Sequence, residues 1–271
     1  MYERHIKETV GYIRDRFHKP IDVAIILGSG LDTFADLLQD RIVFYYRNVP
    51  HFHDSGVEGH ESLLMFGYIG SRAVMVMSGR QHYYEGRGMD TVTFPIRVIA
   101  ALGIKTLILT CASGAIREDL NAGSIVLIKD HISLFAPSPL RGENLDTFGP
   151  RFPDMSHIYD EHLRNLVKQV ASEHGIKISE AVYNFYQGPQ YETPADVRAL
   201  RVLGADVCGM SVVPEAIVAV HSGVKVIGFS LVTNKAAGLS GNTLSHEEVL
   251  TVSKRSALDI NTLIYQTILN L

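Results

Sequence analysis

The stretch Gly188–Lys235 limits the possible folds of this 271-residue chain more than any other part of it. Its first two residues, a glycine and a proline, end a strand, and Thr193-Pro194 then predicts a helix with Thr193 as the N-cap and Pro194 at N1. Apolar residues at helical spacing continue this helix as far as Gly204. Glu192 therefore lies at a fixed junction between a strand and a helix.

Two further strand ends follow within the same stretch. Gly209-Met210-Ser211 forms one junction, and the apolar run Val226–Val232, typical of a buried strand, ends at Thr233-Asn234-Lys235. Each end offers a polar group, and ligands of α/β proteins bind where strand ends meet. We therefore expect one site that is built from these ends.

Strand and helix patterns alternate along the whole chain. The expected strands are Val23–Leu27, Ile42–Tyr46, Leu63–Tyr68, Ala73–Met77, Thr106–Thr110, Ile125–Ile128, Val182–Tyr186 and Val226–Val232. The expected helices are Tyr2–Phe17, Leu31–Leu38, Asp90–Leu102, Asp160–Glu173, Thr193–Leu203, Val213–His221 and His246–Leu269. This alternation implies an α/β fold in which helices flank a sheet. With 46% hydrophobic content the chain can form one large α/β domain or two ordinary ones, and we expect a single domain spanning residues 1–271.

The composition argues against several classes of function. The net charge of −4, without any run of Lys or Arg, gives no support for binding to nucleic acid or to a membrane surface. The N-terminal segment is a charged amphipathic helix rather than a signal peptide, and no later apolar run reaches membrane-spanning length. Cys111 and Cys208 form no CxxC pair and follow apolar runs, so we expect reduced core thiols and a cytoplasmic protein.

The ends of the first and fourth expected strands carry groups that suit an anion. Ser29, between two glycines and before a helix, can form an anion cradle with nearby backbone N–H groups, or the glycines can simply form a turn. It is not a Walker loop, because no Gly-Lys-Ser/Thr follows. In an extended chain Arg80, His82 and Tyr84 point to one side, which suits a dianion. A solvated Arg and a buried core His remain the alternative.

Two more strand ends offer small residues. Ala112 lies in Thr110–Gly114, where backbone N–H groups can approach a ligand closely, and Ser211 ends a further strand. The sequence shows no carboxylate cluster of the kind that holds Mg²⁺. These ends therefore favour free phosphate over a nucleoside triphosphate.

Histidines outside these ends allow two further hypotheses. Ser245 and Glu248 predict a capping box that places His246 at N1 of the last helix, where the helix dipole disfavours the protonated ring. A neutral His246 can hydrogen-bond a sugar hydroxyl, or it can be a surface residue that happens to begin a helix. The segment His51–Asp54, together with His60, could chelate a metal, but its flanks indicate a flexible loop and we expect no metal site.

The segment Ala136–Ser156 is rich in Pro, Gly, Arg and Asp. Its composition predicts a long surface excursion. The segment could contact another subunit, or it could be a mobile loop, and its composition is consistent with both.

A series of short motifs runs from end to end of the chain: ILGSGL (Ile26–Leu31), GRQHYYEG (Gly79–Gly86), TFPIRV (Thr93–Val98), Lys129-Asp130-His131, PLRGEN (Pro139–Asn144), GPQYET (Gly188–Thr193), GADVCGMSVVPE (Gly204–Glu215), TNKAAG (Thr233–Gly238) and SHEEV (Ser245–Val249). In content and order they resemble the purine nucleoside phosphorylases of the homotrimeric, 6-oxopurine-specific class. The resemblance implies a nucleoside phosphorylase-like α/β fold, a single domain with a central mixed, partly barrel-like β-sheet flanked by helices.

The resemblance also implies an activity, the reversible phosphorolysis of purine ribonucleosides or 2′-deoxyribonucleosides such as inosine and guanosine. Its products are the free base and the pentose 1-phosphate, as used in purine salvage. The implied substrates are a purine nucleoside and orthophosphate, which is a co-substrate rather than a cofactor. No cofactor, metal, nucleic acid or membrane is implied, and the expected assembly is a homotrimer.

Site residues follow from the same motifs, and the resemblance alone assigns their roles. The implied phosphate ligands are Ser29, Arg80, His82, Ala112 through its backbone, Ser211 and His60. The implied sugar contacts are Tyr84, Met210, His246 and Phe152, the last one closing the pocket of a neighbouring subunit. The implied base contacts are Tyr191, Glu192 and Asn234. Among these, His82, Glu192, Asn234 and His246 are the expected catalytic residues.

The base contacts predict which purines are accepted. Glu192 can accept a hydrogen bond from N1–H and Asn234 can bond N7 and O6, whereas adenine has no N1–H and carries a 6-amino group. Cys111, Ser113 and Ala115 depart from the family's usual Thr-Asn-Ala-Ala-Gly-Gly at this strand end, which leaves the ranking of inosine, guanosine and xanthosine open.

Three rival functions fit the residues less well. A methylthioadenosine phosphorylase would need a 6-amino-compatible base site and an apolar 5′ pocket, which Asn234 and His246 oppose. A nucleoside hydrolase would need a water-activating base or a metal, while this chain commits Ser29, Arg80 and His82 to an anion. A non-catalytic purine-binding protein would need no phosphate pocket, so Arg80 and His82, which suit an anion, weigh against this function.

Overall fold

The computed structural model describes residues 1–56, 61–239 and 246–271, without the side chains of His246 and Glu248. Its strands are β1 (Val23–Leu27), β2 (Gln39–Tyr45), β3 (Leu63–Ile69), β4 (Arg72–Ser78), β5 (Thr106–Ala115), β6 (Ile125–Ile132), β7 (Ile178–Phe185), β8 (Val207–Gly209) and β9 (Lys225–Lys235). Its α-helices are α1 (Tyr2–Arg14), α2 (Met89–Ala101), α3 (Glu161–Glu173), α4 (Pro194–Val202), α5 (Val213–His221) and α6 (His246–Leu269). The predicted strands are confirmed with bounds shifted by a few residues.

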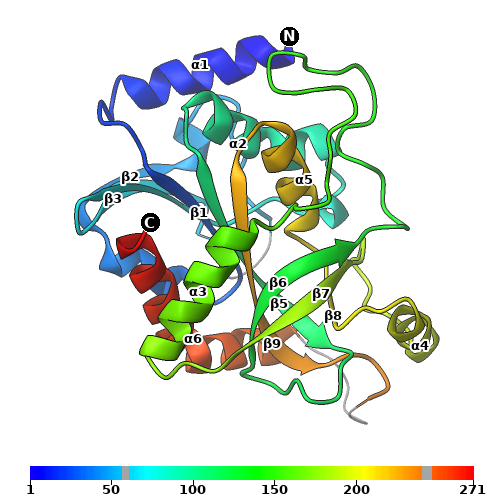
Figure 1. Cartoon of the computed structure of the whole chain (residues 1–271). Coiled ribbons are helices and arrows are strands. Elements are labelled where there is room, and N and C mark those ends of the chain that lie inside the picture. Colours follow the sequence, from blue (N-terminus) through cyan, green and yellow to red (C-terminus); the bar gives the residue numbers. More distant parts are fainter. Residues whose placement is uncertain (57–60, 240–245) are drawn as a thin grey trace.

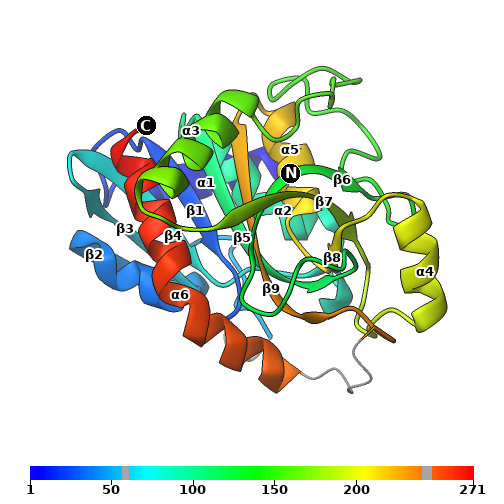
Figure 2. The same ribbon diagram turned by 60° about the horizontal axis from the view of Figure 1, so that its bottom comes forward.

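The strands form one mixed sheet that closes partly on itself (Figure 1). Its order is β2-β3-β4-β1-β5-β8-β7-β6-β9, and β9 also pairs in parallel with β5. The last five strands in this order therefore form a closed barrel, while β2, β3, β4 and β1 extend from β5 as an open sheet (Figure 2). This confirms the expected α/β fold with a mixed, partly barrel-like sheet.

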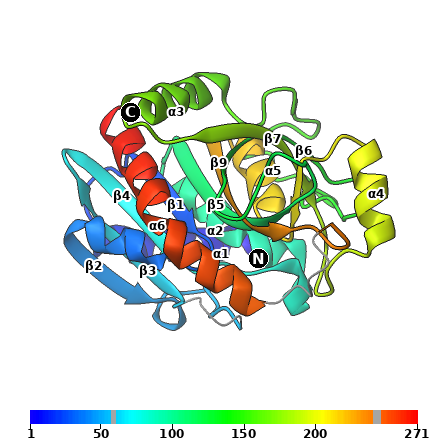
Figure 3. The ribbon, with the colours of Figure 1, turned by 90° about the horizontal axis from the view of Figure 1, so that it is seen from below.

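Helices cover both faces of the open sheet and the outside of the barrel. One large apolar cluster packs the sheet against α1, α2 and α5, and a second packs its other face against α3 and α6. Seen from below, α6 crosses the sheet while α4 stands apart at the outer edge of the barrel (Figure 3). Val197 and Leu200 attach α4 there by packing against Cys208 of β8. No helix of the described part of the chain is both long and apolar enough to cross a bilayer.

The segment predicted as the helix Leu31–Leu38 is a 3-10 helix, Asp32–Leu37, rather than an α-helix. Its length is limited because β2 begins two residues later, at Gln39, and 3-10 geometry is typical of such short connections. Asp32 accepts a hydrogen bond from the Ser78 hydroxyl at 2.6 Å. The strand end at Ser29 therefore lacks the α-helix dipole that the anion-cradle prediction assumed, and only its turn geometry remains.

Two strands differ more from the prediction. The strand β5 continues five residues past Thr110 to Ala115, because it pairs with β9 over that whole length. The strand β8 has only three residues and ends at Gly209, two residues before the strand end predicted at Ser211, and it closes the barrel between β5 and β7.

Candidate active site

A cavity of about 450 Å³ opens where the ends of β5, β8 and β9 meet the segment after β4. The predicted site residues that line it are Ser29, Arg80, His82, Tyr84, Ala112, Tyr191, Glu192, Met210, Ser211 and Asn234. The fold thus brings together residues that are up to 205 positions apart, from 29 to 234. The prediction that these strand ends meet at one place is confirmed.

Three predicted site residues are not placed in this cavity. Phe152 lies on the long segment between β6 and α3 and is 89% exposed. His60 lies outside the described residues, as does the predicted N-cap Ser245. His246 begins α6 as expected, but its side chain is not described.

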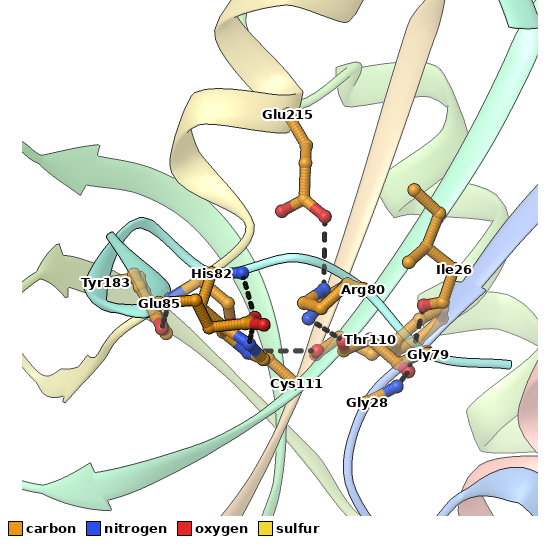
Figure 4. Close-up of polar contacts among 12 residues, drawn as sticks. Ile26, Gly28, Gly79, Arg80, His82, Glu85, Thr110, Cys111, Tyr183 and Glu215 are labelled. Atoms are coloured by element: carbon orange, nitrogen blue, oxygen red, sulfur yellow. Dashed lines mark hydrogen bonds and ion pairs between the residues drawn. The ribbon is translucent and has the colours of Figure 1, made fainter. Parts of the chain in front are cut away.

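The guanidinium of Arg80 is held by two buried partners (Figure 4). Its Nε donates to Oε1 of Glu215 at 3.0 Å, and its Nη1 donates to the carbonyl oxygen of Thr110 at 2.7 Å. Its Nη2 is buried and has no hydrogen-bond partner within the described parts of the chain. Because buried donors are nearly always paired in folded proteins, an unpaired guanidinium nitrogen beside a cavity indicates an anion-binding position.

Thr110 also joins β5 to the end of β1. Its hydroxyl accepts from the backbone N–H of Gly28 at 2.7 Å and donates to the carbonyl of Ile26 at 3.2 Å (Figure 4). A side chain at Gly28 would come within 2.8 Å of the backbone of Cys111, so only glycine fits this approach. These contacts place Ser29 at the rim of the same cavity.

His82 is oriented by a carboxylate three residues later. Oε1 of Glu85 accepts from the backbone N–H of His82 at 2.6 Å and lies 3.2 Å from its Nδ1. Burial opposes ionisation of Glu85, but hydrogen bonds from His82 and Gly56 outweigh it and lower its pKa to about 2. Burial lowers the pKa of His82, and the contact with Glu85 opposes this shift only in part. The His82 ring stacks on Tyr84 with centroids 4.7 Å apart, which keeps both rings on the cavity wall.

Glu192 also lines the cavity, at the junction before α4 that the sequence predicts. The next residue, Thr193, caps α4: its hydroxyl accepts from the N–H of Asp196, whose carboxylate accepts in return from the N–H of Thr193. Glu192 is only 6% exposed. Burial raises the pKa of the Cys208 thiol, and the nearby Glu192 carboxylate raises it further. The thiol and the carboxylate therefore lie against each other on the cavity wall.

Asn234 retains hydrogen-bonding capacity for a ligand. Its Nδ2 donates to the carbonyl of Lys235 and its Oδ1 accepts from the Thr233 hydroxyl, both at 2.8 Å. An amide group offers two N–H donors and two acceptor positions, so one donor and one acceptor remain. Asn234 pairs in register with Gly114 of β5, which holds it level with that strand end.

Sequence reasoning missed several residues that shape this site. Glu85 follows His82 at the spacing of a capping box, a pattern that could have revealed it. Cys208 was interpreted only as a core thiol, yet it lines the cavity. Glu215 gave no signal, because its contact with Arg80 joins residues 135 positions apart. Within the described residues, no three His, Cys, Asp or Glu side chains gather closely enough to hold a metal ion.

Comparisons with known proteins point to one kind of enzyme. The family model of the phosphorylase superfamily matches residues 22–269. Purine nucleoside phosphorylase 1 of Geobacillus stearothermophilus is 43% identical over 254 residues, which is 94% of this chain and 93% of the relative. A Schistosoma purine nucleoside phosphorylase solved with hypoxanthine superposes with a TM-score of 0.93 at 38% identity, covering 99% of this chain and 97% of that one. Isoform 2 of the Schistosoma mansoni enzyme, solved with cytosine and ribose-1-phosphate, gives a TM-score of 0.94 at 38% identity, covering 99% and 96%.

Proposed function

Because this chain belongs to the purine nucleoside phosphorylase family, we propose that it catalyses the reversible phosphorolysis of purine nucleosides. Orthophosphate attacks C1′ of the sugar, the glycosidic bond to N9 breaks, and the products are the free purine and the pentose 1-phosphate. The observation that carries this proposal is the lining of the cavity, which combines Arg80, whose Nη2 has no partner in the described parts of the chain, with Glu192 and Asn234.

One part of this lining suits phosphate. Arg80, Ser29, Ser211, Ala112 and His82 all line the cavity, and in this proposal the Nη2 of Arg80, the two serine side chains, the backbone of Ala112 and His82 hold the phosphate. Phosphate binds to such groups because each donates a hydrogen bond and Arg80 adds a positive charge. In the reaction the bound anion supplies the attacking oxygen and also stabilises the cationic character that develops at C1′.

Another part of the lining suits a 6-oxopurine. Glu192 accepts from N1–H, while Asn234 uses its remaining N–H to donate to O6 or N7 of the leaving base. Negative charge builds on the purine as the bond to C1′ breaks, so hydrogen bonds from Asn234 strengthen in the transition state. Adenine would leave Glu192 unpaired in a buried site, which favours inosine and guanosine over adenosine by roughly a thousandfold.

Tyr84 and Met210 also line the cavity, next to each other at Gly188, and suit the sugar. His246 completes the sugar site in this proposal. We further propose a homotrimer in which Phe152 reaches the cavity of a neighbouring subunit, an arrangement that its 89% exposure supports. The reaction as proposed needs no cofactor. Cytoplasmic location also stays a prediction, supported by Cys111 and Cys208, which are both buried and unpaired.

Purified protein with inosine, assayed with and without orthophosphate, tests the proposal. Hypoxanthine and ribose 1-phosphate should form together, and only when phosphate is present. Release of hypoxanthine with free ribose would indicate a hydrolase, and no turnover of inosine or guanosine would contradict the proposal.

A further inference from the structure

Glu215 is a buried carboxylate that has no role in the reaction as described. It lies in the first turn of α5, on the opposite side of the Arg80 guanidinium from Thr110, and it is 3% exposed (Figure 4). Its Oε1 accepts from Nε of Arg80 at 3.0 Å, and both side chains are almost fully shielded from water. A negative charge this close to an anion site weakens anion binding, so its presence needs an explanation.

The explanation lies in what Glu215 does to Arg80. A guanidinium can present different pairs of its N–H groups, and a long side chain has many rotamers. Here Nε is fixed by Glu215 and Nη1 by the Thr110 carbonyl, and Nη2 is the guanidinium nitrogen that has no partner in the described parts of the chain. Both fixed partners belong to rigid elements, the first turn of α5 and the middle of β5.

We infer that Glu215 is a positioning residue for the phosphate step: it holds Arg80 so that Nη2 faces the attacking phosphate. The inference rests on the proposed phosphate site. It assigns to Glu215 an effect on phosphate use that nucleoside binding does not share. Asn234 pairs with Gly114, four residues beyond the Thr110 carbonyl that holds Arg80, and Glu192 lies against Cys208, which also pairs with Gly114.

Two variants separate the position of the acceptor from its charge. Glu215→Asp keeps the charge but shortens the side chain by one methylene, so its carboxylate no longer reaches Nε at 3.0 Å. Glu215→Gln keeps the reach and an acceptor oxygen but removes the charge. A one-ångström displacement of a positioning contact can cost roughly a hundredfold in rate. We therefore expect Glu215→Asp to raise the KM for phosphate at least tenfold and to leave the KM for inosine within about twofold.

Glu215→Gln should have the opposite effect. Because the acceptor stays in place and a negative charge beside the phosphate site is lost, its KM for phosphate should equal or fall below the wild-type value. Glu118→Asp and Glu118→Gln are matched controls, since Glu118 pairs with Arg201 at an exposed position away from the cavity. Neither control should change either KM.

Steady-state kinetics with phosphate and inosine varied separately test the inference. A second measurement, the rise in Tm of each variant on adding phosphate alone, reports binding without turnover. The inference is overturned if Glu215→Asp has the same KM for phosphate as the wild type, or if Glu215→Gln raises the KM for phosphate as much as Glu215→Asp does. If the wild type itself shows no dependence on phosphate, the proposed function fails instead, so the two failures are distinguishable.

Discussion

Asn234 is the residue on which the proposed base selectivity depends most directly. Its amide group can donate to the 6-oxo group, whereas a carboxylate in the same place could only accept, as a 6-amino group requires. We expect Asn234→Asp to raise the ratio of kcat/KM for adenosine to that for inosine by about a hundredfold. Parallel assays with both nucleosides measure this ratio. A variant that keeps its preference for inosine would exclude Asn234 as the discriminating group.

Asn184 is a buried residue whose side-chain amide has no hydrogen-bond partner in the described part of the chain. It lies in β7 opposite Cys208, it is 1% exposed, and neither Oδ1 nor Nδ2 has a partner within the described residues. A buried amide without partners is destabilising, and valine is the better strand former. Asn184→Val should therefore increase the free energy of unfolding by about 1 kcal/mol. Urea denaturation measures it, and a loss of stability would mean that the amide is paired after all.

The lowered pKa of His131 implies that the free energy of unfolding depends on pH. Burial lowers its pKa from 6.5 to about 4, and its Nδ1 lies 3.2 Å from the hydroxyl of Tyr159. Below pH 6.5 the unfolded chain binds a proton here that the folded chain does not, so stability is highest above this pH and falls as the pH drops toward 4. By pH 5 the loss should reach about 2 kcal/mol. Urea unfolding of the wild type and of His131→Asn at pH 7 and pH 5 should show a smaller loss for the variant, and equal losses would contradict the assignment.

At the scale of single elements, the N-terminus of α4 joins stability to activity. The hydroxyl of Thr193 caps this helix, and Glu192 is the residue just before it. Thr193→Ala should cost about 1 kcal/mol of stability and raise the KM for inosine, because the carboxylate of Glu192 then loses its fixed position. Thr193→Ser retains the capping oxygen and should behave as the wild type. A stability loss in Thr193→Ala with an unchanged KM would show that the cap does not position Glu192.

Elements were predictable from sequence where local chemistry determines them. The helix α5 and the strand β1 have the predicted bounds, since each is a continuous apolar or amphipathic run that ends at a glycine or a polar residue. A strand that ends near Ser211 was expected, but the bounds of the three-residue β8 were not, because they depend on pairing with two distant strands. The 3-10 helix Asp32–Leu37 differs from the prediction for a similar reason, since the start of β2 limits its length.

The candidate site shows the same division. Arg80 and His82 were predictable because they follow the end of β4 at alternating positions. Tyr84 lines the cavity too, but from the 3-10 helix Tyr83–Glu85 and not from the extended chain that the prediction assumed. Glu215 and Cys208 were not, because they contact Arg80 and Glu192 only through the closure of the barrel and the docking of α5. A sequence pattern reports neighbours along the chain, whereas these contacts join elements that are distant in it.

At the scale of the whole molecule, the long segment between β6 and α3 is anchored to the helices beneath it. His221 of α5 accepts from Arg97 of α2 at 2.8 Å, and its other ring nitrogen lies 3.2 Å from Oδ1 of Asn144. Asn144 in turn donates to the carbonyl of Gly149 at 2.9 Å. Phe152 therefore extends from an anchored base, which favours contact with another subunit over a mobile loop.

Mixing two inactive variants tests this arrangement. If each cavity combines its own Glu192 with Phe152 of a neighbouring subunit, a Phe152→Ala chain still supplies Glu192 and a Glu192→Ala chain still supplies Phe152. A mixed trimer then contains cavities in which both residues are intact. Refolding the two variants together should restore part of the activity that each lacks alone, and sedimentation should give the mass of a trimer. Mixed protein no more active than its components would contradict a shared site.

The strand β5 contacts both ends of the cavity. The carbonyl of Thr110 holds Arg80, and Gly114 lies opposite Asn234 four residues further along. Since an extended chain rises about 3.3 Å per residue, the two positions are separated by roughly 13 Å of stiff backbone. The covalent geometry of this strand therefore fixes the spacing between the proposed phosphate and base positions, so the proposed site selects a substrate by its length as well as its chemistry. One residue inserted between Ala112 and Gly114 would lengthen this part of β5 and turn the side chains that follow to the opposite face of the sheet. Substitutions can therefore change the groups at either end of the cavity far more easily than the distance between them.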